Sequence, residues 1–312
     1  MKKLFILIAG AALLMLTACT NTAKEQTPPE AETKTIVDAR GEVEIPINPQ
    51  RIVDLSGNSD ILHILGYKVI GTANSDAYDY TKFPSYLENI LQGAAILGYS
   101  MQDTMDIEGV INLEPDLIVI SNVQEKMYEQ LQAIAPTVMI QLEALDWKED
   151  IKRVGSVMGK EAEAQAWLDA YAAQAEKASK QIKETYGEEA TYLSFLASGG
   201  QFYVFSGAGF GGVLYNDLQL GYPAGMPPQD SISLPVVTYE GLAAIQADYI
   251  FAIATEADLA EMNKNSIWKG LEAVKNNHVV VLPSSPYFNQ GYSPIGKQLL
   301  LDETLALLNG IQ

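Results

Sequence analysis

Short apolar runs recur along the chain from residue 52 onward and predict the strands of buried β-sheets. Most of these runs are apolar at consecutive positions, which is typical of strands covered on both faces in a parallel sheet. Helix-like stretches lie between them, such as 59–65, where Gly66 is expected directly after the helix C-terminus. This alternation of strands and helices indicates α/β architecture. The predicted strands lie within residues 52–55, 69–70, 117–120, 137–140, 192–196, 202–205, 249–254 and 279–282.

Residues 147–186 differ from the rest because they form one long stretch rich in strong helix formers, with Gly155 and Gly159 in its first third. A helix over 161–186 would be ~39 Å long at 1.5 Å per residue, which is enough to join two lobes. An ordinary helix packed on one domain is the alternative. Apolar side chains at spacings of three or four residues give this helix one stripe, formed by Trp167, Tyr171, Ala175, Ala178 and Ile182.

The two halves of the chain resemble each other around one acidic pattern. Glu108 and Glu240 each stand at the start of a short amphipathic helix, and Asp116 and Asp248 follow eight residues later, each opening a buried strand. A repeat much longer than a solenoid period indicates a duplicated lobe. The alternative is coincidence between two generic helix–strand units.

The N-terminus has the pattern of a secretory signal. Lys2 and Lys3 precede an uncharged run over 4–16, which is followed by small residues and Cys19. The run is shorter than the ~20 residues that a membrane-spanning helix needs. Residues 16–19 resemble a bacterial lipobox, which implies lipidation of Cys19 and explains an unpaired cysteine in an exported protein.

Residues 20–35 contain no large apolar side chain and are expected to form a solvated tether between the membrane and the globular body. We therefore expect a membrane-anchored, extracytoplasmic protein. The predicted organisation is a signal peptide over 1–18, a tether over 19–35, an N-terminal lobe over 36–146, an inter-lobe helical segment over 147–186 and a C-terminal lobe over 187–312.

Charge and composition exclude several functions. The chain carries 39 acidic and 20 basic side chains, a formal net charge of −19, which disfavours nucleic acid as a partner. Only Arg40, Arg51 and Arg153 are arginines, so a site built on several guanidinium groups is excluded. One cysteine and two separated histidines argue against a disulfide and a clustered zinc site. We find no catalytic constellation and expect neither an enzyme nor a bound cofactor.

Several segments together resemble one known family, the iron-siderophore and cobalamin substrate-binding proteins of ABC importers. The resemblance rests on the lipobox and tether and on segments 38–41, 49–53, 114–118, 134–138 and 287–294. It implies two α/β lobes, each with a mainly parallel sheet flanked by helices, joined by one long rigid helix. It also implies a monomeric receptor that holds its ligand between the lobes and delivers it to an ABC permease dimer with its ATPase. One exposed glutamate per lobe contacts the permease in this family, and Glu108 and Glu240 match that pattern.

Ligands of doubly wound sheets bind beyond the carboxyl ends of the strands, and this rule selects the candidate contacts. Aromatic walls with a few hydroxyl and amide groups suit a bulky, partly apolar chelate, although any single aromatic side chain could instead belong to the core. The candidates are Ser56, Asn58, Asn74, Tyr99 and Asn122 in the first lobe, and Tyr203, Phe210, Tyr287, Phe288 and Tyr292 in the second. The family's aromatic contacts match Tyr203, Phe210, Tyr287 and Tyr292.

The family's frequent cleft arginine has no counterpart in this chain. Iron catecholates are polyanions that require several cationic partners, so a neutral or cationic chelate such as a ferric hydroxamate is favoured. Lys68, Lys82 and Lys126 are the lysines closest to the predicted strand ends. Iron would be held by the siderophore rather than by protein ligands.

Two alternatives remain open at this point. Residues 206–212 contain a G-x-G-x-x-G pattern after a predicted strand, but no second strand follows to present a ribose-binding acid, so a loop at the cleft rim is preferred to a dinucleotide site. An exported enzyme built on this loop is one alternative function. A heme or cobalamin receptor on the same scaffold is the other.

Overall fold

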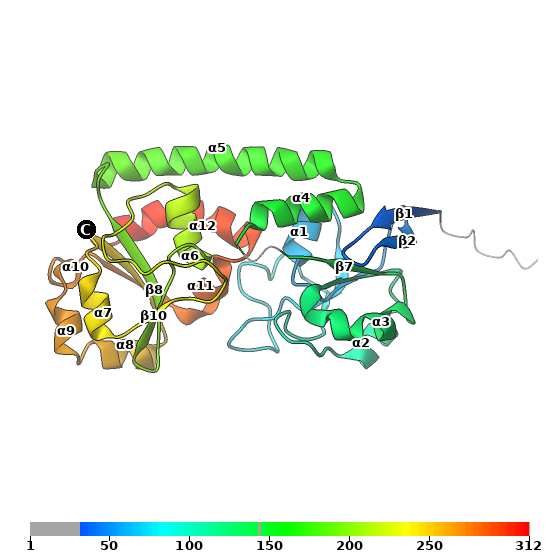
Figure 1. Cartoon of the computed structure of the whole chain (residues 1–312), viewed down its shortest axis with the longest axis horizontal. Coiled ribbons are helices and arrows are strands. Elements are labelled where there is room, and N and C mark those ends of the chain that lie inside the picture. Colours follow the sequence, from blue (N-terminus) through cyan, green and yellow to red (C-terminus); the bar gives the residue numbers. More distant parts are fainter. Residues whose placement is uncertain (1–31, 143–144, 312) are drawn as a thin grey trace, which may run out of the picture.

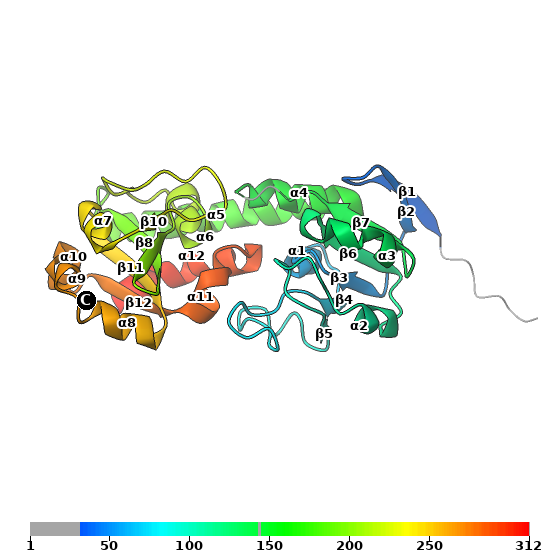
Figure 2. The same ribbon diagram turned by 60° about the horizontal axis from the view of Figure 1, so that its bottom comes forward.

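The computed structural model describes residues 32–142 and 145–311. Two α/β lobes lie side by side, and helix α5 (Glu161–Tyr186) runs along one side of both (Figure 1). Helix α11 (Ser284–Gln290) and the start of α12 (Pro294–Asn309) lie at the junction of the lobes, and α12 then runs along the C-terminal lobe (Figures 1 and 2). The predicted fold class, two lobes with mainly parallel sheets joined by a long helix, is confirmed.

The N-terminal lobe is built on a five-stranded parallel sheet in the order β5-β4-β3-β6-β7. Ile52 pairs with Leu117 at the start of the two central strands, and every residue of β6 and β7 is buried. The consecutive apolar runs are thus explained by helices and loops covering both faces. The elements are β3 (Ile52–Asp54), α1 (Ser59–Ile64), β4 (Val69–Thr72), β5 (Ala95–Ile96), α2 (Ile107–Asn112), β6 (Leu117–Ser121), the 3₁₀ helix η1 (Asn122–Met127), α3 (Tyr128–Gln132) and β7 (Thr137–Ile140).

The C-terminal lobe repeats this plan with an antiparallel addition. Strands β8, β11 and β12 are parallel, and β9 and β10 extend the sheet antiparallel in the order β10-β9-β8-β11-β12. Its elements are β8 (Tyr192–Ser198), β9 (Gln201–Val204), α6 (Gly209–Gly211), the π-helical turn η2 (Gly212–Asp217), β10 (Val236–Val237), α7 (Tyr239–Ala244), β11 (Tyr249–Ala254), α8 (Glu256–Met262), α9 (Ser266–Gly270), α10 (Glu272–Lys275) and β12 (Val279–Pro283), followed by α11 and α12.

Equivalent aspartates confirm the resemblance between the halves. The Asp116 carboxylate accepts hydrogen bonds from the backbone N–H groups of Gln50 (2.7 Å) and Arg51 (2.9 Å), just before β3. The Asp248 carboxylate accepts one from the backbone N–H of Thr191 (2.8 Å), just before β8. Each aspartate therefore ties the start of one central strand to the start of its parallel neighbour.

The inter-lobe segment consists of two helices. Helix α4 (Trp147–Met158) ends at Gly159, whose φ of 70° lies in the left-handed region, and α5 then begins at Glu161 as predicted. Trp147 stacks edge-on against Trp167 and Tyr171, with ring centroids 6.1 and 4.9 Å apart. Trp147 and Trp167 pack against the cores of both lobes. This aromatic cluster fixes the helices to both lobes at once.

The predicted tether differs from the structure at its end. Strand β1 (Thr33–Val37) pairs antiparallel with β2 (Glu42–Pro46), so residues 33–35 belong to a hairpin rather than to a tether. Alternating half-buried side chains on β1 explain why a polar segment still forms a strand. The signal peptide, Cys19 and the tether before residue 32 lie outside the described residues. Within the described ranges no helix is long and apolar enough to cross a membrane.

Candidate functional site

A pocket of about 330 Å³ lies between the two lobes. The N-terminal lobe contributes its strand-end loops and the long segment between β4 and α2, and the C-terminal lobe contributes α11 and the loop before β10. We call it the cleft pocket. Its lining residues are Gly57, 74–75, Pro84, Tyr86, 99–101, Ile232, Leu234, 288–289 and 292–293.

A buried acid at the end of β3 organises the first strand-end loop. The Asp54 carboxylate accepts hydrogen bonds from the hydroxyls of Ser56 (2.5 Å) and Ser59 (2.6 Å). Burial raises the pKa of Asp54, and these hydroxyls counteract that effect. Asn58 in turn donates to the Ser56 hydroxyl (2.8 Å). Ser56 and Asn58 are buried and satisfied within this network and do not line the cleft pocket, which corrects their prediction as ligand contacts.

Asn74 lies at the end of β4 and does line the pocket. Its side-chain amide donates to the carbonyl of Gly57 (2.9 Å), and its oxygen accepts from the backbone N–H of Ser59 (3.2 Å). The two neighbouring strand-end loops are therefore braced against each other beside the pocket. Gly57 has a φ of 88°, which favours glycine at this close approach.

Aromatic rings form most of the pocket walls. Tyr99 stacks on Tyr80 with centroids 5.0 Å apart, and Asn289 of the other lobe lines the same pocket. Phe288 meets Tyr78 and Tyr292 edge-on, with centroids 6.2 and 6.3 Å away. The structure thus brings together four predicted side chains, those of Asn74, Tyr99, Phe288 and Tyr292.

Burial raises the pKa values of the tyrosines that line the pocket, Tyr86, Tyr99 and Tyr292. Their hydroxyls therefore remain protonated at physiological pH and can donate hydrogen bonds to an oxygen-rich ligand. Tyr86 was not predicted from the sequence, because it lies in a long irregular segment without a periodic pattern.

None of the residues lining the cleft pocket carries a charge. Two of the lysines expected near the strand ends form ion pairs with neighbouring aspartates. Lys82 lies 2.7 Å from Asp79, and Lys126 lies 3.1 Å from Asp103. The described ranges also contain no cluster of three potential metal ligands among His, Cys, Asp and Glu. The pocket is an uncharged, aromatic and hydroxyl-rich surface.

Two hydrogen bonds join the lobes beside this pocket. The hydroxyl of Ser293 donates to Asp60 on α1, and the hydroxyl of Ser285 donates to Asp76 after β4. Burial raises the pKa of Asp60 to about 6, and the Ser293 hydroxyl counteracts the rise. Ser293 also caps α12, because its side chain accepts from the backbone N–H of Gly296 (3.1 Å).

The glycine-rich loop 206–212 has a structural role. The side-chain oxygen of Gln229 accepts hydrogen bonds from the consecutive backbone N–H groups of Ser206 (3.1 Å), Gly207 (2.9 Å) and Ala208 (3.2 Å). A Cβ on Gly211 would lie 1.9 Å from the Phe205 carbonyl oxygen, so glycine is required for packing. The amide group of Gln229 donates to the carbonyls of residues 231 and 233. Gln229 therefore anchors the loop that carries Ile232 and Leu234 into the cleft pocket.

Several predicted contacts lie elsewhere. Phe210 is fully buried and packs against Phe251 at 4.9 Å between ring centroids, so its prediction as a ligand contact is wrong. Tyr203 on β9 and Tyr287 on α11 are half-buried against the core of the C-terminal lobe and do not line the pocket. Asn122 is exposed at the end of β6 and accepts a 3.5 Å hydrogen bond from the backbone N–H of Leu142.

Glu108 and Glu240 occupy equivalent positions in the first turns of α2 and α7, on different lobes (Figure 1). Both are exposed. Backbone and Thr238 hydrogen bonds lower the pKa of Glu240, with the Thr238 hydroxyl 2.8 Å away. The helix N-termini are capped by Asp106 and Thr238 rather than by the glutamates.

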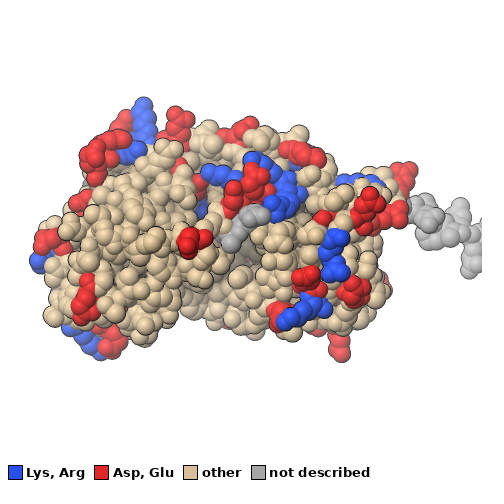
Figure 3. Space-filling model, in the orientation of Figure 1, with Lys and Arg blue, Asp and Glu red and all other residues tan. Residues whose placement is uncertain are grey.

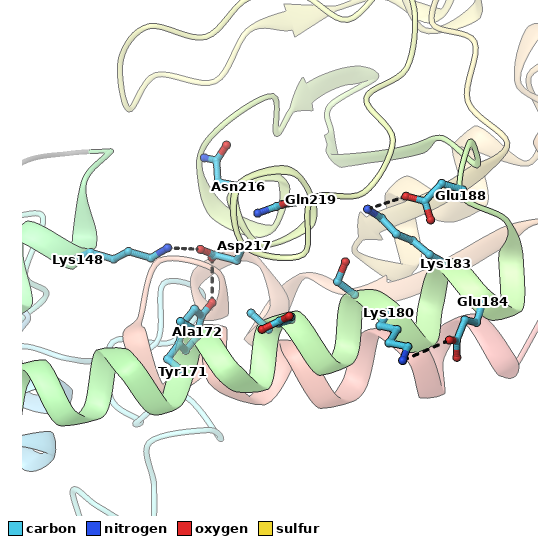
Figure 4. Close-up of a pocket in the computed structure, with 13 residues that line it drawn as sticks. Lys148, Tyr171, Ala172, Lys180, Lys183, Glu184, Glu188, Asn216, Asp217 and Gln219 are labelled. Atoms are coloured by element: carbon cyan, nitrogen blue, oxygen red, sulfur yellow. Dashed lines mark hydrogen bonds and ion pairs between the residues drawn. The ribbon is translucent and has the colours of Figure 1, made fainter.

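A second, charged groove of about 660 Å³ runs between α5 and η2. Figure 4 shows three ion pairs among its charged side chains, Lys148–Asp217, Lys180–Glu184 and Lys183–Glu188. In the space-filling view, by contrast, much of the C-terminal lobe carries no charge on this face (Figure 3). The groove lies on the helix side of the lobe and shares no lining residue with the cleft pocket.

Comparison with known proteins decides the family. The sequence profile described as periplasmic binding protein matches residues 57–286. The chain belongs to the periplasmic binding protein family. The iron(3+)-hydroxamate-binding protein FhuD of Bacillus subtilis (strain 168) is 32% identical to this periplasmic binding protein over 316 residues, 96% of each chain. The iron(3+)-hydroxamate-binding protein YxeB of the same strain is 29% identical over 318 residues, 96% of this chain and 95% of YxeB.

Solved structures agree with this assignment. Staphylococcus aureus SirA complexed with staphyloferrin B matches with a TM-score of 0.67 and 27% identity, over 89% of this chain and 99% of SirA. A FhuD fold-family binding protein of a Fep/Fec-like ferrichrome ABC transporter from Bacillus subtilis matches with a TM-score of 0.70 and 27% identity, over 87% and 98% of the two chains. These relatives of the periplasmic binding protein are binding proteins, and the family resemblance predicted from the sequence is confirmed.

Proposed function

We propose that this periplasmic binding protein is a siderophore receptor that binds a ferric hydroxamate in the cleft pocket. The observation that carries the proposal is the absence of any charged residue among those lining the pocket. An uncharged ferric trihydroxamate loses little by leaving water for such a surface, whereas a trianionic tricatecholate would be buried without a counter-charge. The protonated hydroxyls of Tyr86, Tyr99 and Tyr292 and the amide of Asn74 supply donors to the hydroxamate oxygens.

The receptor is proposed to act outside the cytoplasm as a monomer anchored through lipidated Cys19. The signal and lipobox patterns support this, as do related proteins of Bacillus subtilis that are named lipoproteins. Delivery to an ABC permease dimer with its ATPase follows from the family. Glu108 and Glu240 are the proposed permease contacts, because they are exposed and equivalent on the two lobes. Exposed charges of this kind steer the encounter and fix its register.

Fluorescence titration tests the ligand. Trp147, Trp167 and Trp268 report binding to the mature protein. We expect saturable quenching by ferrichrome, an uncharged ferric trihydroxamate, without chemical turnover. A ferric tricatecholate, heme and cobalamin should bind much more weakly. Equal or tighter binding of the tricatecholate would refute the charge argument, and preference for heme or cobalamin would assign a different ligand.

A matched pair of tyrosine variants tests the location. Tyr292→Ala removes a pocket wall and should weaken ferrichrome binding by about 2 kcal/mol, or about 30-fold in Kd. Tyr222→Ala removes a tyrosine that is 48% exposed and packs against Tyr215 outside the pocket. It should leave the Kd unchanged. Equal effects of the two variants would place the ligand elsewhere.

A further inference from the structure

A second cavity, of about 220 Å³, shares Tyr292 with the cleft pocket. Its walls come from the start of α4, the glycine-rich loop and α12. We call it the Lys297 cavity, after the lysine on the second turn of α12 that lines it. Lys297 was not among the lysines expected near the cleft. A single lysine in an amphipathic helix usually faces solvent, so nothing in the sequence indicates that this one is buried.

Lys297 is a buried cation that forms no hydrogen bond or ion pair with any of the described residues. The residue is only 4% exposed, and its Nζ lies 5.5 Å from the centre of the Trp147 ring. Among the described residues, none forms a hydrogen bond or ion pair with this Nζ. Burial lowers the pKa of Lys297 to about 8, so the side chain is still mostly protonated at neutral pH. An unpaired buried ammonium group is costly, and an anion in the adjacent cavity would compensate it.

The other charges around the cavity are already engaged. Lys148 pairs with Asp217 at 2.8 Å, and the Tyr171 hydroxyl donates to the second oxygen of Asp217 at 2.9 Å (Figure 4). Asp146 is exposed and caps α4 by accepting from the backbone N–H of Glu149 (3.2 Å). Among the described residues that line the cavity, Lys297 is therefore the cation without a hydrogen bond or ion pair, and the Asp217 carboxylate acts on it only at longer range.

We propose that the Lys297 cavity binds a single carboxylate carried by the chelate in the cleft pocket. This rests on the proposed function. A singly charged group matches the one unpaired ammonium, whereas a doubly charged phosphate would be repelled by Asp217 and Asp146. The volume suffices for a carboxylate with ordered water, since one water occupies about 30 Å³. Tyr292 is the lining residue that the two spaces share, so the proposal requires the acidic arm of the ligand to pass the Tyr292 ring to reach Lys297.

The substrate class follows from the two cavities together. The uncharged cleft pocket receives the neutral ferric hydroxamate centre, and the Lys297 cavity receives an acidic arm. The preferred ligand is therefore a ferric trihydroxamate with one free terminal carboxylate rather than a fully neutral one.

The test compares a linear ferric trihydroxamate bearing a terminal carboxylate with the same chelate capped as its methyl amide. Wild-type protein should bind the carboxylate form about tenfold more tightly in fluorescence titration. Lys297→Met should abolish that preference while leaving the Kd of the amide form within twofold. Lys180→Met is the matched control, because it removes one positive charge at an exposed site on α5, paired with Glu184 at 3.8 Å. This control should keep the preference.

The outcomes separate this inference from the proposed function. Equal binding of both forms by wild-type protein, or a preference that survives in Lys297→Met, overturns the carboxylate site and leaves the receptor function intact. Absence of binding of either form overturns both. The wild-type comparison requires no variant, so it decides the matter even if Lys297→Met does not fold. Sodium acetate at 100 mM should compete with the carboxylate form only, and equal competition with both forms would also contradict the site.

Discussion

Asp60 provides a sharp test of the contact between the lobes. Its side chain on α1 is buried and accepts a hydrogen bond from Ser293 at the start of α12. Burial raises its pKa from 3.8 to about 6, and the nearby Asp54 adds to the rise. The folded state therefore holds a proton on Asp60 more tightly than the unfolded state does. Between pH 3.8 and 6 the folded protein binds more protons, so this group makes the free energy of unfolding fall as the pH rises.

The magnitude follows from the shift. A difference of about 2 pKa units corresponds to about 3 kcal/mol, present as a penalty above pH 6 and absent well below pH 3.8. Asp60→Asn keeps the shape of the side chain and removes its titration. The stability difference, variant minus wild type, should therefore be about 2–3 kcal/mol more favourable at pH 7.5 than at pH 4. Contributions of carboxylates that do not interact with Asp60 are common to both proteins and cancel, whereas the interaction with Asp54 is part of the measured difference.

Urea unfolding of both proteins at a series of pH values measures this difference. Ser293→Ala is the companion variant, because it removes the hydrogen bond that lowers the pKa of Asp60. In Ser293→Ala, Asp60 should titrate at a higher pH than in the wild-type protein. The free energy of unfolding of this variant should therefore continue to fall above pH 6. Parallel pH profiles for wild type and Asp60→Asn would refute the reasoning, since they would show that burial of Asp60 does not shift its pKa.

Three further predictions concern the loop, the permease and the motion. Gln229→Ala should lower the free energy of unfolding by about 1–3 kcal/mol, because it leaves backbone N–H groups unpaired. It should also raise the ferrichrome Kd, and an unchanged Kd would show that Gln229 does not position Ile232. Glu108→Ala combined with Glu240→Ala should preserve chelate binding and thermal stability but reduce iron uptake by cells; normal uptake at equal abundance would refute the docking role. Ligand binding should change the radius of gyration in X-ray scattering only slightly, because α5 resists bending; a large decrease would contradict this.

Secondary structure was predictable wherever one local pattern dominated. Strands β7 and β11 have the predicted bounds, because consecutive apolar residues flanked by polar ones leave little freedom in register. Helix α5 also has its predicted bounds, because Gly159 ends the preceding helix and Gly187 ends α5 itself. Strand β1 was not among the predicted strands, because a polar, half-buried hairpin strand has the composition of a tether.

The candidate site was only partly predictable. The strand-end rule selects Asn74 and Tyr99, which line the cleft pocket, but it cannot tell that a buried acid, Asp54, engages Ser56 and Asn58 instead. That engagement depends on which hydroxyls reach a side chain buried by the fold. Tyr86 lies in a long irregular segment, whose path is set by tertiary contacts and leaves no periodic signal.

The prediction of Phe210 as a ligand contact was wrong for a related reason. It lies in the predicted cleft loop, yet the close packing of Gly211 on the Phe205 carbonyl turns the chain and buries the Phe210 ring against Phe251. From the sequence alone, an aromatic residue next to glycines could line the cleft or be buried in the core. Backbone geometry decides between them.

The most direct test of the account is a crystal structure with ferrichrome bound, in which the anomalous signal of iron locates the chelate. We predict one iron atom in the cleft pocket between Asn74 of the N-terminal lobe and Tyr292 of the C-terminal lobe, with hydroxamate oxygens facing the tyrosine hydroxyls. Iron in the charged groove beside α5, or coordination of iron by protein carboxylates instead of an intact siderophore, would contradict the central claim.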